Sequence, residues 1–92
     1  MLEKQVEAKV FAWAKKNGVK TYKLGGTNNR GKPDRIFMAN GETLFMELKR
    51  PGKEPTKLQW KEIMELRALG IHADWADTPG SAIELIKEYL IL

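Results

Sequence analysis

Residues 31–52 have the sequence GKPDRIFMANGETLFMELKRPG, in which Asn40-Gly41 separates two short apolar segments. Asn-Gly is the dipeptide most typical of a two-residue turn between antiparallel strands. The flanking segments DRIFMA (34–39) and TLFMELK (43–49) contain the β-branched and aromatic residues that strands favour. This stretch therefore predicts a β-hairpin.

The sequence before the hairpin predicts one helix and one strand. Apolar residues recur at helical spacing from Leu2 to Trp13, and Gly18 follows as a natural stop, which indicates a helix over residues 3–17. Residues 19–24, VKTYKL, alternate as a strand does. Residues 25–33 are rich in glycine and asparagine and indicate a loop.

The sequence after the hairpin predicts a helix, a strand and a last helix. Thr56 and Gln59 have the spacing of a capping box, so a helix is expected from about residue 57 to Leu69, before Gly70. IHADWA (71–76) is typical of a strand. Asp77-Thr78-Pro79 supplies an N-cap and a first-turn proline for a helix that ends near Tyr89.

The element order is thus α-β-β-β-α-β-α. The first three strands are expected to form an antiparallel meander, and the helix at 57–69 crosses over to place the last strand beside the sheet. We therefore predict an α/β fold with a mixed sheet flanked by helices, formed by residues 1–92 as a single domain.

Composition excludes several classes of function. The chain has no cysteine, which rules out disulfides, thiolate metal sites and cysteine nucleophiles. Neither a signal peptide nor an apolar run of the roughly 18 residues that a membrane span needs is visible. No Gly-Lys-Ser/Thr follows the glycines at 25, 26 and 31, so no nucleotide cofactor is expected. These features favour the cytoplasm as the compartment.

Positive charge is concentrated in the middle of the chain. Twelve basic and four acidic residues lie between Lys15 and Lys61, a net charge of +8, whereas the remainder holds four basic and eight acidic residues. A basic region of this kind suits a polyanion such as DNA, because phosphate contacts release counterions. Lysines that serve only solubility would give the same composition.

Three residues of the hairpin form a pattern that suits phosphodiester chemistry. Pro33-Asp34 is followed, after twelve residues, by Glu47-Leu48-Lys49. Because strand side chains alternate between faces, Glu47 and Lys49 share one face, and the other face is the better candidate for the core. The predicted hairpin places Asp34 across from this pair.

Such a group could bind a hard cation and activate water. Mg²⁺ takes one or two carboxylates together with water and phosphate oxygens, and it lowers the pKa of its bound water. A lysine beside the carboxylates could hold or deprotonate that water. The alternative is that Asp34 belongs to a turn while Glu47 and Lys49 lie on a solvated strand face.

The segments GKPD (31–34), MELKRPG (46–52) and Thr56-x-x-Gln59 closely resemble the virus-type replication-repair nuclease domain, VRR-NUC, of the PD-(D/E)xK superfamily. The resemblance extends from the first helix to about Trp75. It implies a restriction-endonuclease-like core, dependence on Mg²⁺ or Mn²⁺, and DNA cleavage. The chain resembles the stand-alone minimal members of phage type, and this implies a homodimer that acts on branched DNA such as four-way (Holliday) junctions.

The resemblance also implies an acid from the first helix as a further metal ligand. Glu3 and Glu7 fall close together at one margin of the apolar stripe. Glu7 has the spacing to Gly18 found in archaeal junction resolvases and is preferred, while Glu3 matches the initial glutamate of VRR-NUC sequences. In the alternative reading, both only form surface salt bridges. The Leu48 backbone carbonyl is expected as another ligand.

Further residues are assigned to the scissile phosphate or to the DNA backbone. Gln59 is either only the capping partner of Thr56 or, as the family implies, a contact of the phosphate or of a bound water. Loops on both sides of the centre supply candidate DNA contacts, with a simple connector as the alternative for the first loop: Asn28, Asn29, Arg30, Lys32, Arg50, Lys53 and Lys57. His72 is expected to be an ordinary strand residue.

Two apolar groups outside the expected core suggest an interface. Trp60 and Met64 lie one helical turn apart, and the chain ends in EYLIL. Either group could hold a homodimer, or both could fill a thin core. The expected function is therefore a metal-dependent DNA endonuclease, with a non-catalytic DNA-binding module and a protein-interaction subunit as the rivals.

Overall fold

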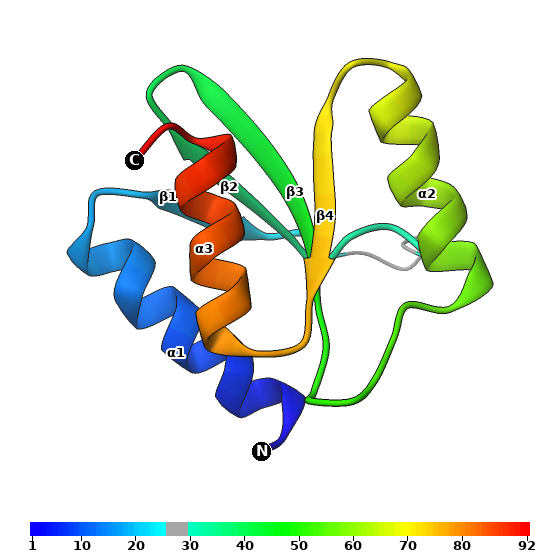
Figure 1. The fold of residues 1–92 in the computed structure, drawn as a ribbon, viewed down its shortest axis with the longest axis horizontal. Coiled ribbons are helices and arrows are strands. Elements are labelled where there is room, and N and C mark those ends of the chain that lie inside the picture. The colour runs from blue at the N-terminus through cyan, green and yellow to red at the C-terminus, as the bar shows by residue number, and fades with distance from the viewer. Residues whose placement is uncertain (26–29) are drawn as a thin grey trace.

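The computed structural model describes residues 1–25 and 30–92, which form a central sheet with helices on both faces (Figure 1). The elements follow the predicted order α-β-β-β-α-β-α. Their bounds agree with the sequence-based ranges to within two residues: α1 (Glu3–Lys16), β1 (Lys20–Lys23), β2 (Arg35–Ala39), β3 (Glu42–Leu48), α2 (Lys57–Ala68), β4 (His72–Ala76) and α3 (Pro79–Tyr89).

The sheet is mixed, with the strands in the order β1-β2-β3-β4. β1, β2 and β3 are antiparallel neighbours, and β4 lies parallel to β3 after the crossover through α2. Asn40 and Gly41 form the turn of the hairpin with positive φ angles of 54° and 77°, as a type I′ turn requires. Because Ala39 pairs with Glu42, this turn fixes the register of the whole β2–β3 pair.

The helices cover the two faces unequally. α1 and α3 lie side by side on one face, and α2 lies on the other, against β4 (Figure 1). The main core fills the space between the sheet and the α1–α3 pair. Its buried residues come from both helices and from three strands: Val6, Val10, Ala14, Val19, Phe37, Leu44, Met46, Leu48, Ala76, Ala82, Ile86 and Leu90.

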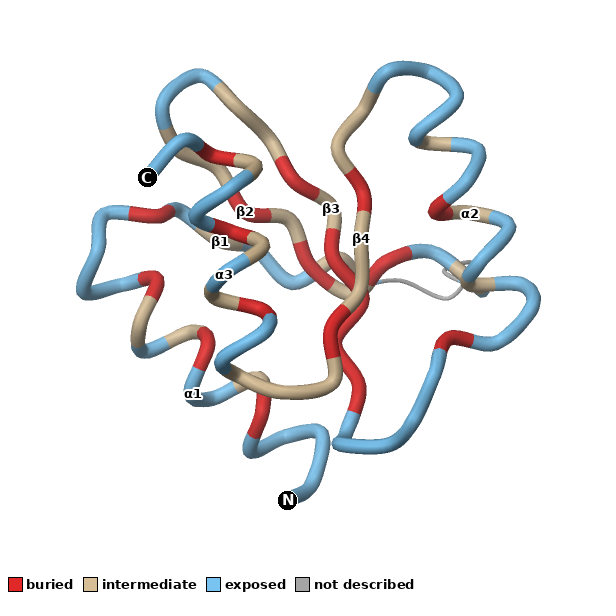
Figure 2. The backbone as a smooth tube through the Cα atoms, in the orientation of Figure 1, coloured by how far each residue is buried: buried red, intermediate tan, exposed pale blue. Residues whose placement is uncertain are grey.

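The α2 side of the sheet has much less apolar burial. Ile63 is the buried residue of α2. The helix packs against β4, whose Ala73 is also buried. On β3 the buried positions continue without alternation through the last three residues of the strand and into Lys49, as the tube of Figure 2 shows. Glu47 and Lys49 therefore lie in a partly polar layer beneath α2.

Side-chain caps and a long-range contact fix the helix ends. Thr56 Oγ1 accepts from the Gln59 N–H at 3.2 Å, and Gln59 Oε1 accepts from the Thr56 N–H at 2.9 Å, which is the predicted capping box. Thr78 caps α3. The Asn40 side-chain amide donates to the carbonyl of Leu90 at 2.8 Å, so the hairpin turn also satisfies the end of α3.

None of the helices in residues 1–25 and 30–92 is long and apolar enough to cross a membrane.

Gly31 lets the loop before β2 approach the first turn of α2. Its φ is +75°, and a Cβ placed there would lie 2.5 Å from Leu58 Cγ and 2.9 Å from the Leu58 carbonyl oxygen. We expect Gly31→Ala to lower the free energy of unfolding by about 2 kcal/mol or more, because a left-handed backbone and an overpacked contact are combined. Urea denaturation measures this loss.

Gly18→Ala is the matched control for that experiment. Gly18 has a similar φ of +71° but open space around its Cα. It therefore reports the backbone cost alone, about 1 kcal/mol. Equal losses in the two variants would show that the loop does not pack against α2.

Candidate active site

Two carboxylates and one ammonium converge where β2 begins and β3 ends. Arg35 pairs with Met46 in the hairpin register, so Asp34, one residue earlier, lies opposite Glu47. The backbone of Asp34 is held by the Leu24 N–H, which donates to its carbonyl at 2.7 Å. On the other side, the Lys49 N–H donates to the Ala76 carbonyl at 2.8 Å. Both neighbouring strands therefore fix the backbone at this site.

Glu47 and Lys49 are buried together. Their exposed fractions are 2% and 7%, and Lys49 Nζ lies 3.6 Å from Glu47 Oε2. The alternative of a solvated strand face is therefore wrong for these two residues. Withdrawing charges from water is costly unless they are paired or bind an ion, so a buried pair at a strand end indicates a site rather than a solubility surface.

The surroundings of the Glu47 carboxyl disfavour its ionised form. Burial, the charge of Asp34 and a carboxyl–carboxyl hydrogen bond with Asp34 raise the pKa of Glu47 to about 8, and the Lys49 charge only partly opposes this. Two carboxyls can share a hydrogen bond only when one of them holds a proton. When both are ionised, Glu47 Oε1 is a buried oxygen without a donor among the described residues.

Gln59 connects this centre to α2. Its Nε2 donates to Glu47 Oε2 at 3.1 Å, while its Oε1 accepts from the Thr56 N–H. The capping interpretation is therefore confirmed, and the same side chain also bonds Glu47, while a contact with the phosphate or with a bound water stays a prediction. The capping box fixes the position of Gln59, and Gln59 in turn orients the Glu47 carboxylate.

The first helix brings Glu3 toward the centre and Glu7 toward Arg35. Partial burial and the Asp34 charge raise the pKa of Glu3, and Lys49 opposes the shift. Glu7 instead acts on Arg35, whose pKa is lowered by burial and partly restored by the two nearby acids. The charges of Asp34 and Lys49 thus act on Glu3, whereas the charge of Glu7 acts on the neighbouring Arg35 guanidinium.

Arg35 is a buried charge that the sequence analysis did not single out. It is 4% exposed, and its guanidinium carbon lies 3.2 Å from the centroid of the Phe11 ring, a cation–π contact. Strand alternation places Arg35 on the same face as Phe37, which is the core face. The sequence contains a signal for this buried charge, because Arg35 occupies a core-facing position in the strand segment DRIFMA. Its position next to Asp34 adds positive potential beside the carboxylates.

A tight turn presents basic side chains at the opening of the site. Residues 50–53 form a turn in which the Lys53 N–H donates to the Arg50 carbonyl at 3.0 Å. Pro51 is the second residue of the turn, and Gly52 is the third, with a φ of +83°. This is the residue pattern of a type II turn. Asp77 anchors the turn by accepting from the Gly52 N–H at 2.9 Å.

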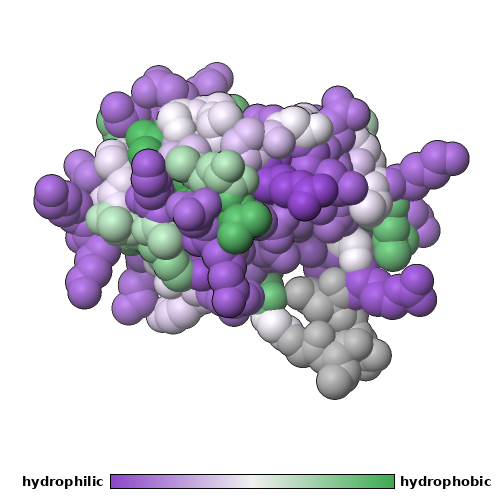
Figure 3. Space-filling model, turned by 90° about the horizontal axis from the view of Figure 1, so that it is seen from below, coloured by the Kyte–Doolittle hydropathy of each residue, from purple (hydrophilic) through white to green (hydrophobic). Residues whose placement is uncertain are grey.

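An open pocket lies between this turn and the start of α1. Its lining combines the catalytic lysine candidate with acidic and basic neighbours: Leu2, Glu3, Lys4, Lys49, Arg50 and Lys53. Figure 3 views the end of the molecule where α1 begins, and that surface is largely hydrophilic with small separate apolar groups. The pocket is therefore suited to a charged, hydrated ligand.

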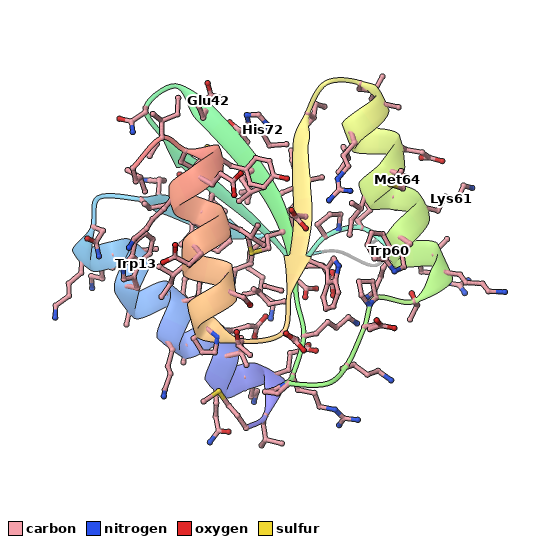
Figure 4. The ribbon with its side chains drawn as sticks, viewed as in Figure 1. Trp13, Glu42, Trp60, Lys61, Met64 and His72 are labelled. Carbon is pink, nitrogen blue, oxygen red and sulfur yellow. The ribbon has the colours of Figure 1, made fainter. Side chains whose placement is uncertain are left out.

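The remaining candidate DNA contacts are exposed or lie outside the described residues. Arg30, Lys32, Arg50, Lys53 and Lys57 are all exposed on the surface. Asn28 and Asn29 belong to residues 26–29, which the structure does not describe. His72 pairs with Glu42 at 2.9 Å, at the far end of β3 from Glu47 (Figure 4), so it takes no part in the centre.

The acids of the centre fit a hard divalent cation, although residues 1–25 and 30–92 contain no group of three or more acidic, histidine or cysteine side chains already arranged around one point. Asp34 and Glu47 supply two carboxylates, and Glu47 Oε1 has no donor when both are charged. A divalent cation between them would remove this repulsion. Mg²⁺ commonly uses only one or two carboxylates, with water completing its shell.

Sequence comparison finds a phage relative of this chain. No family model matches the sequence. The phage protein "Putative nuclease p44" of Acyrthosiphon pisum secondary endosymbiont phage 1 is 38% identical over 69 residues, which cover 74% of each chain.

Solved structures show the same fold. One described as "VRR_NUC domain" has a TM-score of 0.82 at 22% identity and covers 95% of this chain and 96% of its own. A second, "VRR_NUC domain protein", has a TM-score of 0.83 at 23% identity, with 99% and 89% covered. The fold is therefore that of VRR-NUC domains. Together with the phage relative, it shows that the chain belongs to the VRR-NUC family of nucleases, in its phage-type form.

The raised pKa of Glu47 predicts how stability depends on pH in the metal-free protein. A carboxyl whose pKa is higher in the folded than in the unfolded state contributes stability below its unfolded value near 4.5, and this contribution is lost as pH rises toward 8. We expect the free energy of unfolding in EDTA to fall between pH 5 and pH 8. Glu47→Gln, which cannot ionise, should flatten this decline in urea titrations.

Glu54→Gln is the control for this variant, because Glu54 is exposed and lies in the loop after the turn. It removes the same charge without touching the centre. A wild-type decline that Glu47→Gln and Glu54→Gln leave equally unchanged would show that Glu47 does not carry the buried charge.

Proposed function

We propose that this chain is a Mg²⁺- or Mn²⁺-dependent endonuclease that cuts branched DNA, four-way junctions among its substrates. The nuclease class follows from the family. The observation that carries the proposal is the meeting of Asp34, Glu47 and Lys49 at one end of the hairpin, two of them buried. A binding module gains nothing from acids placed where phosphates must come.

Each residue of the centre has a definable task. Asp34 and Glu47 would hold the cation, with the Leu48 carbonyl and a helix-one acid as further ligands. The bound cation supplies an acidified water and neutralises charge on the phosphate. Lys49, whose Nζ lies 3.6 Å from Glu47 Oε2, would orient the attacking water as an ammonium or, as the neutral amine, take up its proton. Gln59 keeps the Glu47 carboxylate in one orientation.

Glu3 is the better supported acid from α1. Its pKa responds to both Asp34 and Lys49, whereas Glu7 acts on Arg35. The sequence spacing favoured Glu7, but the spacing gives only the side of the helix and not how far along the sheet the helix begins. We infer that Glu7 instead balances the buried Arg35 charge.

The basic surface supports a shape-directed grip on DNA. Lys4, Arg50 and Lys53 line the pocket beside Lys49, and Lys57 is the first residue of α2. Contacts of this kind bind phosphates without reading bases, which suits recognition of a branch rather than of a sequence. A homodimer would place two such centres on one junction for paired cuts, and this part of the proposal rests on the family resemblance. The compartment we propose is the bacterial cytoplasm.

Metal binding can be measured without any DNA. Saturating Mg²⁺ should raise the melting temperature of the wild type, by about 10 °C at a hundredfold excess over Kd, because only the folded state brings the two acids together. Asp34→Asn should abolish the shift. Glu42→Gln removes a carboxylate from the same hairpin at its distant end and should keep it. A shift that Asp34→Asn preserves would place the cation elsewhere.

Cleavage tests the enzyme proposal directly. We expect a labelled four-way junction to be cut in Mg²⁺ and left intact in EDTA, with Lys49→Ala lowering the rate at least ~100-fold as expected for loss of a proton-transfer residue. Lys87→Ala, on the exposed surface of α3, serves as the charge-matched control. A linear duplex of the same sequence, run in parallel, measures the preference for branches.

The outcomes separate the competing functions. Binding of the junction without any metal-dependent product would leave a DNA-binding module. Cleavage of junction and duplex at equal rates would retain the nuclease and remove the branch preference. Neither binding nor cleavage would favour a protein-interaction subunit.

A further inference from the structure

Two tryptophans meet beside the proposed active centre. Trp75 is the direct neighbour of Glu47 in the parallel β3–β4 register, and Trp60 follows Gln59, which donates to Glu47. The two indoles contact edge to face, with centroids 6.2 Å apart and planes at 76°. β4 therefore carries an aromatic ring beside Glu47, and α2 carries a second ring in contact with the first.

We propose that Trp60 is a stacking platform for an unpaired base of the DNA, adjacent to the phosphate that the centre cuts. The favoured substrate would then be DNA with a displaced or unpaired base at the cut site, as at a branch point. This inference rests on the proposed nuclease function and specifies its substrate.

The exposure of Trp60 is the first argument. The indole remains 37% exposed although it already touches Trp75. Trp13, by contrast, packs against the main core on the opposite side of the molecule (Figure 4). An aromatic ring that is supported from one side and open to solvent suits stacking, because the supporting contact reduces the freedom that binding must remove.

The surrounding charge is the second argument. Lys57 and Lys61 flank Trp60 on α2, and Lys61 has only a weak, fully exposed pairing with Glu65 at 3.9 Å. The Arg50–Lys53 turn precedes the same helix. Proteins that hold single-stranded nucleic acid combine aromatic platforms with cations that follow the backbone. The arrangement here has both components within one short segment.

The small size of the apolar area favours a base over a second protein chain. Its exposed members on the helix are Leu58, Trp60 and Met64, while Ile63 between them is buried. Charged residues surround them along the helix: Lys57, Lys61, Glu62 and Glu65. A stable protein interface covers about 800 Å² on each partner, with few charges at its centre. A single base needs only one ring face.

The test compares two DNAs that differ by one nucleotide. Affinity is measured in Ca²⁺, without cleavage, for a duplex with one bulged nucleotide and for the same duplex fully paired. We expect Trp60→Leu to raise Kd for the bulged duplex about tenfold, a typical loss of one base–aromatic stack, and to leave the paired duplex unchanged. Trp60→Phe should lie between Trp60→Leu and the wild type.

Met64→Ala is the matched control for the apolar area. It removes an exposed apolar side chain one turn from Trp60 and should change neither Kd. If Trp60→Leu and Met64→Ala weaken both DNAs equally, or both convert a dimer to a monomer in sedimentation, the area is a protein interface and the stacking proposal is wrong.

Tryptophan emission gives a second readout that does not depend on the fold of Trp60→Leu. The bulged duplex should quench emission in Trp13→Phe, where only Trp60 and Trp75 remain, and the paired duplex should not. Absence of this difference would overturn the proposal. Quenching in a protein that cuts no DNA would retain the base site and remove the nuclease function. Cleavage without any Trp60 effect would retain the nuclease function and remove the base site.

Discussion

The buried contact between the Asp34 and Glu47 carboxyls constrains the rest of the structure. Like charges so close in a desolvated position repel, and this raises the pKa of Glu47 to about 8. The charge of Lys49 and a hydrogen bond from Gln59 partly offset the repulsion. These residues come from different segments: Asp34 directly precedes β2, Glu47 lies in β3 with Lys49 just after it, and Gln59 lies in α2. Two acids held this close in a desolvated position are costly, and the divalent cation that we propose between them would remove the repulsion.

The division of the fold into two unequal layers makes this contact tolerable. The α1–α3 side holds nearly all of the fully buried apolar side chains, whereas the α2 side holds Ile63, Ala73 and the charged centre. Apolar burial therefore stabilises mainly one face of the sheet, and the other face carries the candidate active site. Because β3 belongs to both layers, with Leu44, Met46 and Leu48 on one face and Glu47 on the other, the core directly fixes the position of the Glu47 carboxylate.

Local patterns were enough to predict most of this architecture. Asn40-Gly41 predicts the hairpin, the hairpin places Asp34 opposite Glu47, and Thr56 with Gln59 predicts where α2 begins. The facts that the sequence did not show arise from contacts between distant segments. Which turn of α1 meets the sheet decides how near Glu3 and Glu7 come to the centre, and the parallel register of β3 and β4 places Trp75 next to Glu47. Arg35 differs, because its place on the core face of a strand was visible in the alternation.

The position of Gln59 shows how a helix end can set the geometry of a reaction. A glutamine that only bonded Glu47 could follow the carboxylate into several rotamers. A glutamine whose Oε1 is already held by the Thr56 N–H has one direction left for its Nε2. The capping box thus converts the start of α2 into a fixed donor aimed at Glu47, and the next residue along the helix, Trp60, receives an equally fixed position. The first turn of α2 therefore links the orientation of the Glu47 carboxylate to the surface that the DNA would meet.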